Sequence, residues 1–215
     1  MLYIINFKTY AEATGINAIK LANLVAELRE KLKVEIIVAP QFVDLVKISE
    51  ITLTVAQHID PITYGAHTGS ILPQAIKEAG AMGTLLNHSE KKMDLEKIKA
   101  CIEFAKLLEL KTICCAGNLK EVIEISKFGP DYIAFEDPEL IGTGKSITQH
   151  KPEMIERFIE IVRDLNPNII TLCGAGISNS KDVEKAKELG IKGVLVSSAI
   201  VKAKNQREAL LNLIL

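Results

Sequence analysis

The chain has 215 residues, of which 48% are hydrophobic and 25% charged, and this composition excludes an intrinsically disordered protein. Its 26 Lys and Arg residues balance 27 Asp and Glu residues to a formal net charge of -1, without a local basic block, which argues against nucleic acid as a partner. No apolar run approaches the roughly 20 residues of a membrane helix. Residues 1–6 are too short for a signal peptide, so we expect a cytoplasmic protein with no membrane partner.

Short, nearly continuous apolar runs alternate along the chain with longer amphipathic segments. Such runs predict strands that are buried on both faces. The predicted strands, in chain order, are 2–6, 35–39, 52–57, 84–87, 112–116, 132–135, 169–173 and 193–196. Between them, apolar residues recur at helical spacing, for example over 94–108 and over 152–165.

Eight strand–helix units in one chain of this length predict a compact α/β protein, a closed (β/α)8 barrel that forms a single domain over residues 1–215. An open, doubly wound sheet is the alternative. That fold needs a glycine-rich turn after the first strand to bind a dinucleotide. Here the first strand runs into Asn6-Phe7-Lys8 instead, so we favour the barrel.

Four cysteines, at positions 101, 114, 115 and 173, lie in apolar surroundings. They are too few for a disulfide scaffold, and no Cys-x-x-Cys pair is present. We therefore expect reduced and mostly buried thiols.

Polar residues follow several of the predicted strands, at the ends where the active sites of such barrels lie. Lys8 follows the first strand, His88 the fourth and Glu136 the sixth. Each has an ordinary explanation when taken alone: a solvated lysine, a structural histidine, an ion-paired carboxylate. The barrel brings them to one rim, where Glu136 emerges from a dry strand that makes a carboxylate more basic. Ser89-Glu90 are expected to open a helix whose amides favour a neutral imidazole at His88.

Small residues follow the last two strands, as Gly174-Ala175-Gly176 and Ser197-Ser198. Turns at these positions often hold a phosphate through backbone N–H groups. Residues 137–146 begin with a stiffening proline, Pro138, and end with the flexible sequence Gly142-Thr143-Gly144. These are the parts of a hinged lid.

These residues suit the removal of a proton next to a carbonyl group. The reaction needs a base in a dry site, for which Glu136 is the candidate. It also needs electrophilic help on the oxygen, for which His88 is the candidate, with Lys8 and Asn6 nearby. This chemistry requires no cofactor, and the sequence contains no metal-ligand spacing.

At these residues the chain closely resembles the triosephosphate isomerase family, specifically its short archaeal form. The matching segments run in order from one end of the chain to the other. They are Asn6-Phe7-Lys8-Thr9-Tyr10, Ala39-Pro40-Gln41-Phe42, Ala56-Gln57-His58, Gly65-Ala66-His67-Thr68-Gly69, Asn87-His88-Ser89-Glu90-Lys91, residues 136–144 and Cys173-Gly174-Ala175-Gly176-Ile177.

The resemblance implies interconversion of glyceraldehyde 3-phosphate and dihydroxyacetone phosphate, in glycolysis and gluconeogenesis. The roles it assigns are those of the family: Glu136 is the proton-shuttling base, His88 the electrophile, Lys8 the positive charge, and Glu90 a supporting carboxylate. The substrate would further contact Asn6 and Phe7, and the backbone around Ile141, Gly142, Gly176, Ser197 and Ser198 would hold its phosphate. Thr68 lies in a loop that projects into a neighbouring subunit in this family. Short forms tend to be tetramers, so a homotetramer is favoured over a dimer.

The chain departs from the family pattern next to the base and in the last turn. Asp137 follows the base where the family usually has Pro, and Ser197-Ser198 stand where many members carry two glycines. Two alternatives remain at this point. One is a phosphate-binding barrel that acts on another sugar phosphate, and the other is a non-catalytic protein that uses only the fold.

Overall fold

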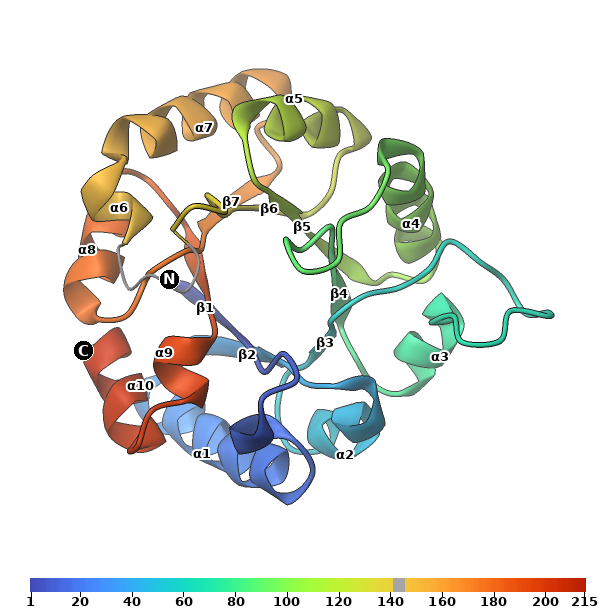
Figure 1. Cartoon of the computed structure of the whole chain (residues 1–215), viewed down its shortest axis with the longest axis horizontal. Helices are drawn as coiled ribbons and strands as arrows, with labels where there is room; N and C mark the ends of the chain where they lie inside the picture. The colour runs from blue at the N-terminus through green and yellow to red at the C-terminus, as the bar shows by residue number, and fades with distance from the viewer. Residues whose placement is uncertain (141–145) are drawn as a thin grey trace.

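The computed structural model describes residues 1–140 and 146–215, and its strands form a ring enclosed by helices (Figure 1). All the strands run parallel in one eight-stranded sheet, in the order β2-β1-β8-β7-β6-β5-β4-β3. Their bounds are β1 Leu2–Asn6, β2 Glu35–Ala39, β3 Val55–Ala56, β4 Gly83–Leu86, β5 Lys111–Ala116, β6 Tyr132–Phe135, β7 Ile170–Cys173 and β8 Gly193–Val196. The predicted (β/α)8 barrel is therefore confirmed.

Helices connect the strands and cover the outside of the ring (Figure 1). The α-helices are α1 Ile16–Leu32, α2 Leu45–Ser49, α3 Pro73–Glu78, α4 Leu95–Leu107, α5 Leu119–Phe128, α6 Ile147–His150, α7 Pro152–Leu165, α8 Ser180–Glu188, α9 Ser198–Val201 and α10 Gln206–Ile214. Two short 3-10 helices, η1 Ala11–Ala13 and η2 Phe42–Asp44, precede α1 and α2.

The ring closes weakly between β2 and β3. A lone bridge joins Val38 to Thr54 there, and the Val38 N–H donates to the Leu53 carbonyl at 3.0 Å. The strand expected over 52–57 is wrong in length, because ladder pairing extends only over Val55–Ala56. Thr52 and Thr54 are nevertheless buried, so the apolar pattern of this segment reflects burial in the wall rather than strand pairing.

Alternate residues of each strand face two separate cores, as the twofold period of a strand requires. In β1, Ile4 packs inside the barrel, while Tyr3 and Ile5 pack outward toward the helices. The barrel interior is filled by Leu2, Ile4, Ile37, Ala39, Val55, Leu85, Ile113, Cys115, Ala134, Leu172 and Leu195. A solid interior of this kind leaves the rim at the carboxyl ends of the strands as the place for a site.

All four cysteines are buried and free, as expected from their apolar surroundings. Burial raises the pKa of the Cys101 thiol to about 12 and that of the Cys115 thiol well above its usual value, and nearby carboxylates add to both shifts. These thiols therefore stay protonated at neutral pH. In the described part of the chain, no helix combines the length and the apolar character needed to span a bilayer.

Candidate active site

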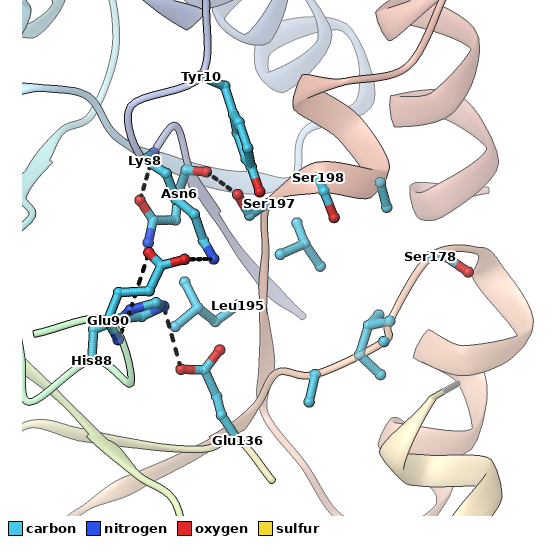
Figure 2. Close-up of a pocket in the computed structure, with 15 residues that line it drawn as sticks. Asn6, Lys8, Tyr10, His88, Glu90, Glu136, Ser178, Leu195, Ser197 and Ser198 are labelled. Atoms are coloured by element: carbon cyan, nitrogen blue, oxygen red, sulfur yellow. Dashed lines mark hydrogen bonds and ion pairs between the residues drawn. The ribbon is translucent and has the colours of Figure 1, made fainter. Parts of the chain in front are cut away.

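A pocket of about 510 Å³ opens at the carboxyl ends of the strands (Figure 2). Most of its lining residues come from the ends of β1, β4, β6, β7 and β8 or from the loops that follow. They are Asn6, Lys8, Tyr10, His88, Glu90, Glu136, Ala175, Gly176, Ile177, Ser178, Leu195, Val196, Ser197, Ser198 and Ala199. The rim predicted from the strand ends and the pocket therefore coincide.

Lys8 leaves β1 in a left-handed backbone conformation, with φ of 48°. Asn6 Oδ1 accepts a hydrogen bond from the Lys8 N–H at 2.9 Å, and the Gln57 amide donates to the Lys8 carbonyl at 3.0 Å. The side chain is only 12% exposed, and its ammonium group forms an ion pair with Glu90 Oε1 at 2.7 Å. The strand end and these contacts place a positive charge at the pocket wall.

His88 is buried beside Glu136, and its Nε2 lies 3.7 Å from Glu136 Oε2. The helix expected to open at Ser89-Glu90 does not form, because α4 begins only at Leu95. Instead the backbone N–H of Glu90 donates to His88 Nδ1 at 3.2 Å. A ring nitrogen that accepts carries no proton, so the imidazole is neutral and its Nε2–H faces the pocket.

Glu136 is 7% exposed and follows β6 directly. Its Oε2 atom is buried and has no hydrogen-bond partner among residues 1–140 and 146–215. Gly174 lies against the other side of this carboxylate, where a Cβ atom would come within 2.5 Å of Glu136 Oε1. A buried carboxylate oxygen without a donor is available to accept a proton from a bound molecule.

The turns after β7 and β8 line the same pocket from the opposite side. Ala175 and Gly176 both have left-handed backbones, with φ of 62° and 75°. The Ser197 hydroxyl donates to the Asn6 carbonyl at 2.7 Å, which joins the end of β8 to the end of β1. This bond occupies the Ser197 side chain, while Ser198 begins α9.

Two polar lining residues, Tyr10 and Ser178, were given no role in the sequence-based prediction of the site. They lie beyond the strand ends, in segments where neither strand periodicity nor a turn signal marks the pocket side. Tyr10 follows Lys8 by two positions, and Lys202 Nζ lies 5.4 Å from the centre of its ring. Figure 2 shows the Tyr10 ring pointing toward the end of β8, where Ser197 and Ser198 lie.

Two residues from the resemblance, Phe7 and Thr68, do not line this pocket. Phe7 was expected to contact substrate, but its side chain is fully buried in the outer core, because strand alternation turns it away from the pocket. Thr68 is exposed in the segment between β3 and α3, which projects from the body of the barrel (Figure 1). Ile141 and Gly142 lie outside the described residues.

Two acidic residues that follow Glu136 are paired with Lys151 at the start of α7. Lys151 Nζ contacts Asp137 Oδ2 at 2.6 Å and Glu139 Oε2 at 3.1 Å. Asp137 Oδ1 also accepts from the Glu139 N–H at 3.0 Å. Asp137, the residue that departs from the family pattern, is therefore paired with a cation rather than left as a second free carboxylate.

A buried carboxylate, an imidazole and a lysine on one barrel rim are typical of enzymes that move a proton next to a carbonyl group. Comparison with known proteins identifies the family within this class. The family model of triosephosphate isomerase matches residues 1–214. The chain belongs to the triosephosphate isomerase family, and it is therefore an isomerase.

Similar proteins from methanogens match along nearly their whole length. Triosephosphate isomerase from Methanothermus fervidus is 46% identical over 215 residues, which cover 99% of this chain and 97% of that protein. Triosephosphate isomerase from Methanocaldococcus jannaschii is 47% identical over 216 residues, which cover 100% of this chain and 99% of that protein.

Proposed function

We propose that residues 1–215 act as one catalytic domain that interconverts glyceraldehyde 3-phosphate and dihydroxyacetone phosphate, with Glu136 as the base. The Glu136 carboxylate takes a proton from the carbon next to the carbonyl, and the C–H electron pair moves into an enediolate. Glu136 then returns the proton to the neighbouring carbon. The hydroxyl proton meanwhile passes from one oxygen of the enediolate to the other, so atoms and electrons balance without a cofactor. The observation that carries this proposal is the buried Oε2 atom beside His88, which has no hydrogen-bond partner in the described part of the chain.

His88 acts as the electrophile in this scheme. Its Nδ1 accepts from a backbone N–H, so Nε2 carries the hydrogen that is donated to the substrate oxygen. Lys8 supplies positive charge where the enediolate develops negative charge, and Glu90 holds that ammonium group in place. Asn6 helps to position the substrate from the end of β1.

The phosphate binds on the opposite side of the pocket. Gly176, Ser197 and Ser198 line this side of the pocket. In this proposal their backbone N–H groups hold the phosphate, and small side chains let the anion approach. Binding energy from a phosphate that does not react helps to hold the carbonyl carbons against Glu136.

The active protein is a homo-oligomer in the cytoplasm, most simply a tetramer built from dimers. Ile16 and Val43 are exposed apolar residues that flank Gly15 and Asp44, which are joined by a hydrogen bond of 2.8 Å. Exposed apolar side chains and a projecting loop that carries Thr68 suit contact with a second copy. Light scattering tests this arrangement, and a monomer at micromolar concentration contradicts it.

The reaction and its base are tested together by assaying the purified protein beside its Glu136→Gln variant. We expect fast isomerisation of glyceraldehyde 3-phosphate by the natural chain, and a loss of roughly a hundredfold or more in kcat for the variant. Binding of a phosphate ligand should remain measurable in both. Near-normal turnover by Glu136→Gln rules out this base, whereas binding without turnover in either protein points to another sugar phosphate.

A further inference from the structure

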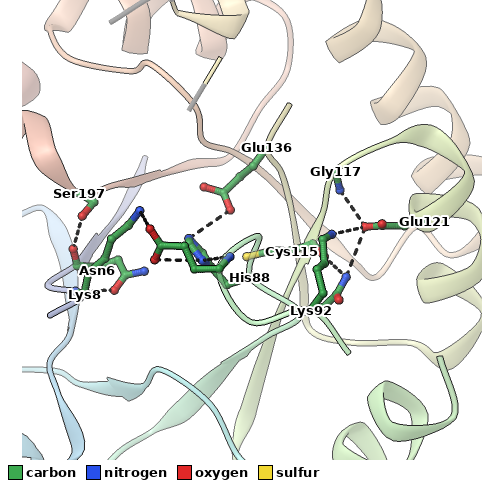
Figure 3. Close-up of polar contacts among 11 residues, drawn as sticks. Asn6, Lys8, His88, Lys92, Cys115, Gly117, Glu121, Glu136 and Ser197 are labelled. Carbon is green, nitrogen blue, oxygen red and sulfur yellow. Dashed lines mark hydrogen bonds and ion pairs between the residues drawn. The ribbon is translucent and has the colours of Figure 1, made fainter. Parts of the chain in front are cut away.

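A cluster of polar groups lies behind His88, outside the pocket. It consists of Asn87, Lys92, the Gly117 N–H and Glu121, and is here called the Glu121 cluster (Figure 3). Glu121 Oε2 accepts from Lys92 Nζ at 2.8 Å, from the Gly117 N–H at 2.9 Å and from the Asn87 amide at 3.4 Å. Three donors, two from the loop after β4 and one from the turn after β5, therefore converge on one carboxylate oxygen.

Asn87 connects this cluster to the residue that follows it, His88. It is 3% exposed and has a left-handed backbone, with φ of 56°. Its amide nitrogen also donates to the Cys115 carbonyl on β5 at 2.9 Å, and its Oδ1 accepts from the Met93 N–H at 3.0 Å. Asn87 therefore joins the end of β4, the wall of the barrel and the far end of the 88–92 loop.

Glu121 is itself fixed in the first turn of α5. Its N–H donates to Asn118 Oδ1 at 2.9 Å, which caps this helix. Burial alone would raise the pKa of Glu121, but hydrogen bonds from Lys92, Gly117 and Asn87 outweigh burial and hold that pKa below its usual value. The carboxylate therefore remains ionised and keeps its three donors at neutral pH.

The imidazole of His88 has few direct supports of its own. Among the described residues, a single hydrogen bond of 3.2 Å, from the Glu90 N–H to Nδ1, orients the ring. Both the ring and that N–H are carried by the loop of residues 87–92, so the direction of Nε2 depends on what holds this loop in place. The Glu121 cluster holds the loop at both ends, through Asn87 and through Lys92.

We infer that Asn87 and Glu121 are positioning residues that set the direction of His88 Nε2 toward the reacting oxygen. They act through the loop and do not contact the substrate. This inference rests on the proposed role of His88 as electrophile. It predicts that loosening the cluster lowers the rate of the chemical step while substrate binding, which relies on other parts of the pocket, is largely kept.

The test uses Asn87→Gly and Glu121→Gln in the full-length protein. Glycine at position 87 retains the left-handed backbone and removes the hydrogen bonds of the side-chain amide. Glutamine at position 121 retains the shape of Glu121 while removing its charge. We expect kcat to fall roughly tenfold or more in each variant, with KM changed by less than about twofold. The imidazole nitrogen-15 signals of His88 should also shift in each variant.

Asp131→Asn provides a matched control. Asp131 accepts from Lys111 Nζ, the Thr112 N–H and the Thr112 hydroxyl, so it closes a similar cluster at the opposite end of β5 and β6. This variant should lose thermal stability but keep kcat, KM and the His88 signals. Asp131→Asn shows what loosening a carboxylate cluster does when the cluster lies far from His88. Any additional loss of kcat in the Glu121 cluster variants then comes from the position of that cluster behind His88.

Two results would overturn the inference without affecting the proposed function. One is a kcat for Asn87→Gly and Glu121→Gln as high as that of Asp131→Asn, and the other is an equal loss in kcat and in substrate binding. Should Glu121→Gln fail to fold, Lys92→Met removes one arm of the cluster at a side chain that is 42% exposed, and the same split is expected. A His88→Gln variant with normal kcat would instead contradict the electrophile assignment itself.

Discussion

At the scale of single residues, the place of the proposed base depends on a neighbour without a side chain. Gly174 follows β7 directly and packs against Glu136, where an added Cβ atom would lie 2.5 Å from Oε1 and 2.8 Å from Cγ of that side chain. Carbon atoms do not approach this closely in folded proteins, so the carboxylate would have to move. The glycine is therefore required by packing against this carboxylate.

We predict that Gly174→Ala lowers kcat by roughly a hundredfold, because a displacement near 1 Å is enough to misplace the base. The φ of Gly174 does not require glycine, so the variant should still fold. Steady-state kinetics with a thermal melt measures both effects. Normal kcat in a folded Gly174→Ala protein would show that Glu136 can relocate at no cost to the reaction.

A second prediction concerns the cation at the pocket wall. Lys8→Ala should weaken the binding of sulfate or a phosphate ligand by roughly tenfold or more, because a charged hydrogen-bond donor is removed from a nearly neutral protein. Calorimetric titration measures the change. Lys97→Ala, which removes an exposed lysine on α4, should leave binding unaltered. Equal binding in all three proteins would argue against a role for Lys8 in anion recognition.

At the scale of elements, most of the rim was predictable because a barrel brings strand ends together. Lys8, His88 and Glu136 each follow a buried strand, so topology alone places them near one another. Strand alternation would also have excluded Phe7, which points to the opposite face from its neighbours. The missing helix after His88 was not predictable, because the Glu90 N–H bonds to the imidazole instead of staying free for a helix start, and this depends on three-dimensional contact.

An element-scale prediction concerns the amino-terminal ends of β5 and β6, which Asp131 joins. Burial would raise the pKa of this carboxyl, but Lys111 and Thr112 outweigh burial and hold it below its usual value. A lowered folded-state pKa stabilises the protein above the ordinary carboxyl range, and this contribution disappears as the pH falls through the lowered value. Asp131→Asn should therefore cost about 1–2 kcal/mol at pH 7.

Urea unfolding of both proteins measures this difference. The two free energies of unfolding should converge as the pH is lowered below the ordinary carboxyl range, because the natural side chain then becomes neutral as well. A gap that stays constant at all pH values would mean that shape, rather than charge, explains the contribution of Asp131.

At the scale of the whole molecule, the extent of backbone pairing between neighbouring strands varies around the ring. Neighbouring strands elsewhere share ladders of two to five paired residues, whereas β2 and β3 share the lone Val38–Thr54 bridge. Local opening starts where few backbone bonds must break. We therefore expect local opening of the barrel to start between β2 and β3.

We predict faster hydrogen exchange in residues 52–57 than in 111–116, although both segments contribute to the same wall. Mass spectrometry of peptides after timed exchange compares them directly. Protection of 52–57 equal to that of 111–116 would show that side-chain packing, not ladder pairing, sets the local stability of the wall. The comparison is best made at several protein concentrations, since association would cover nearby loops.

The four buried thiols have a practical consequence. Thiol reagents attack the deprotonated and accessible form, which none of these cysteines offers in the folded chain. A single cysteine introduced on the surface would therefore be the one fast-reacting site for a fluorophore or spin label, with all the native cysteines left in place. Enzymes with exposed cysteines need those residues replaced first, but here the natural sequence already provides a background suitable for site-specific labelling.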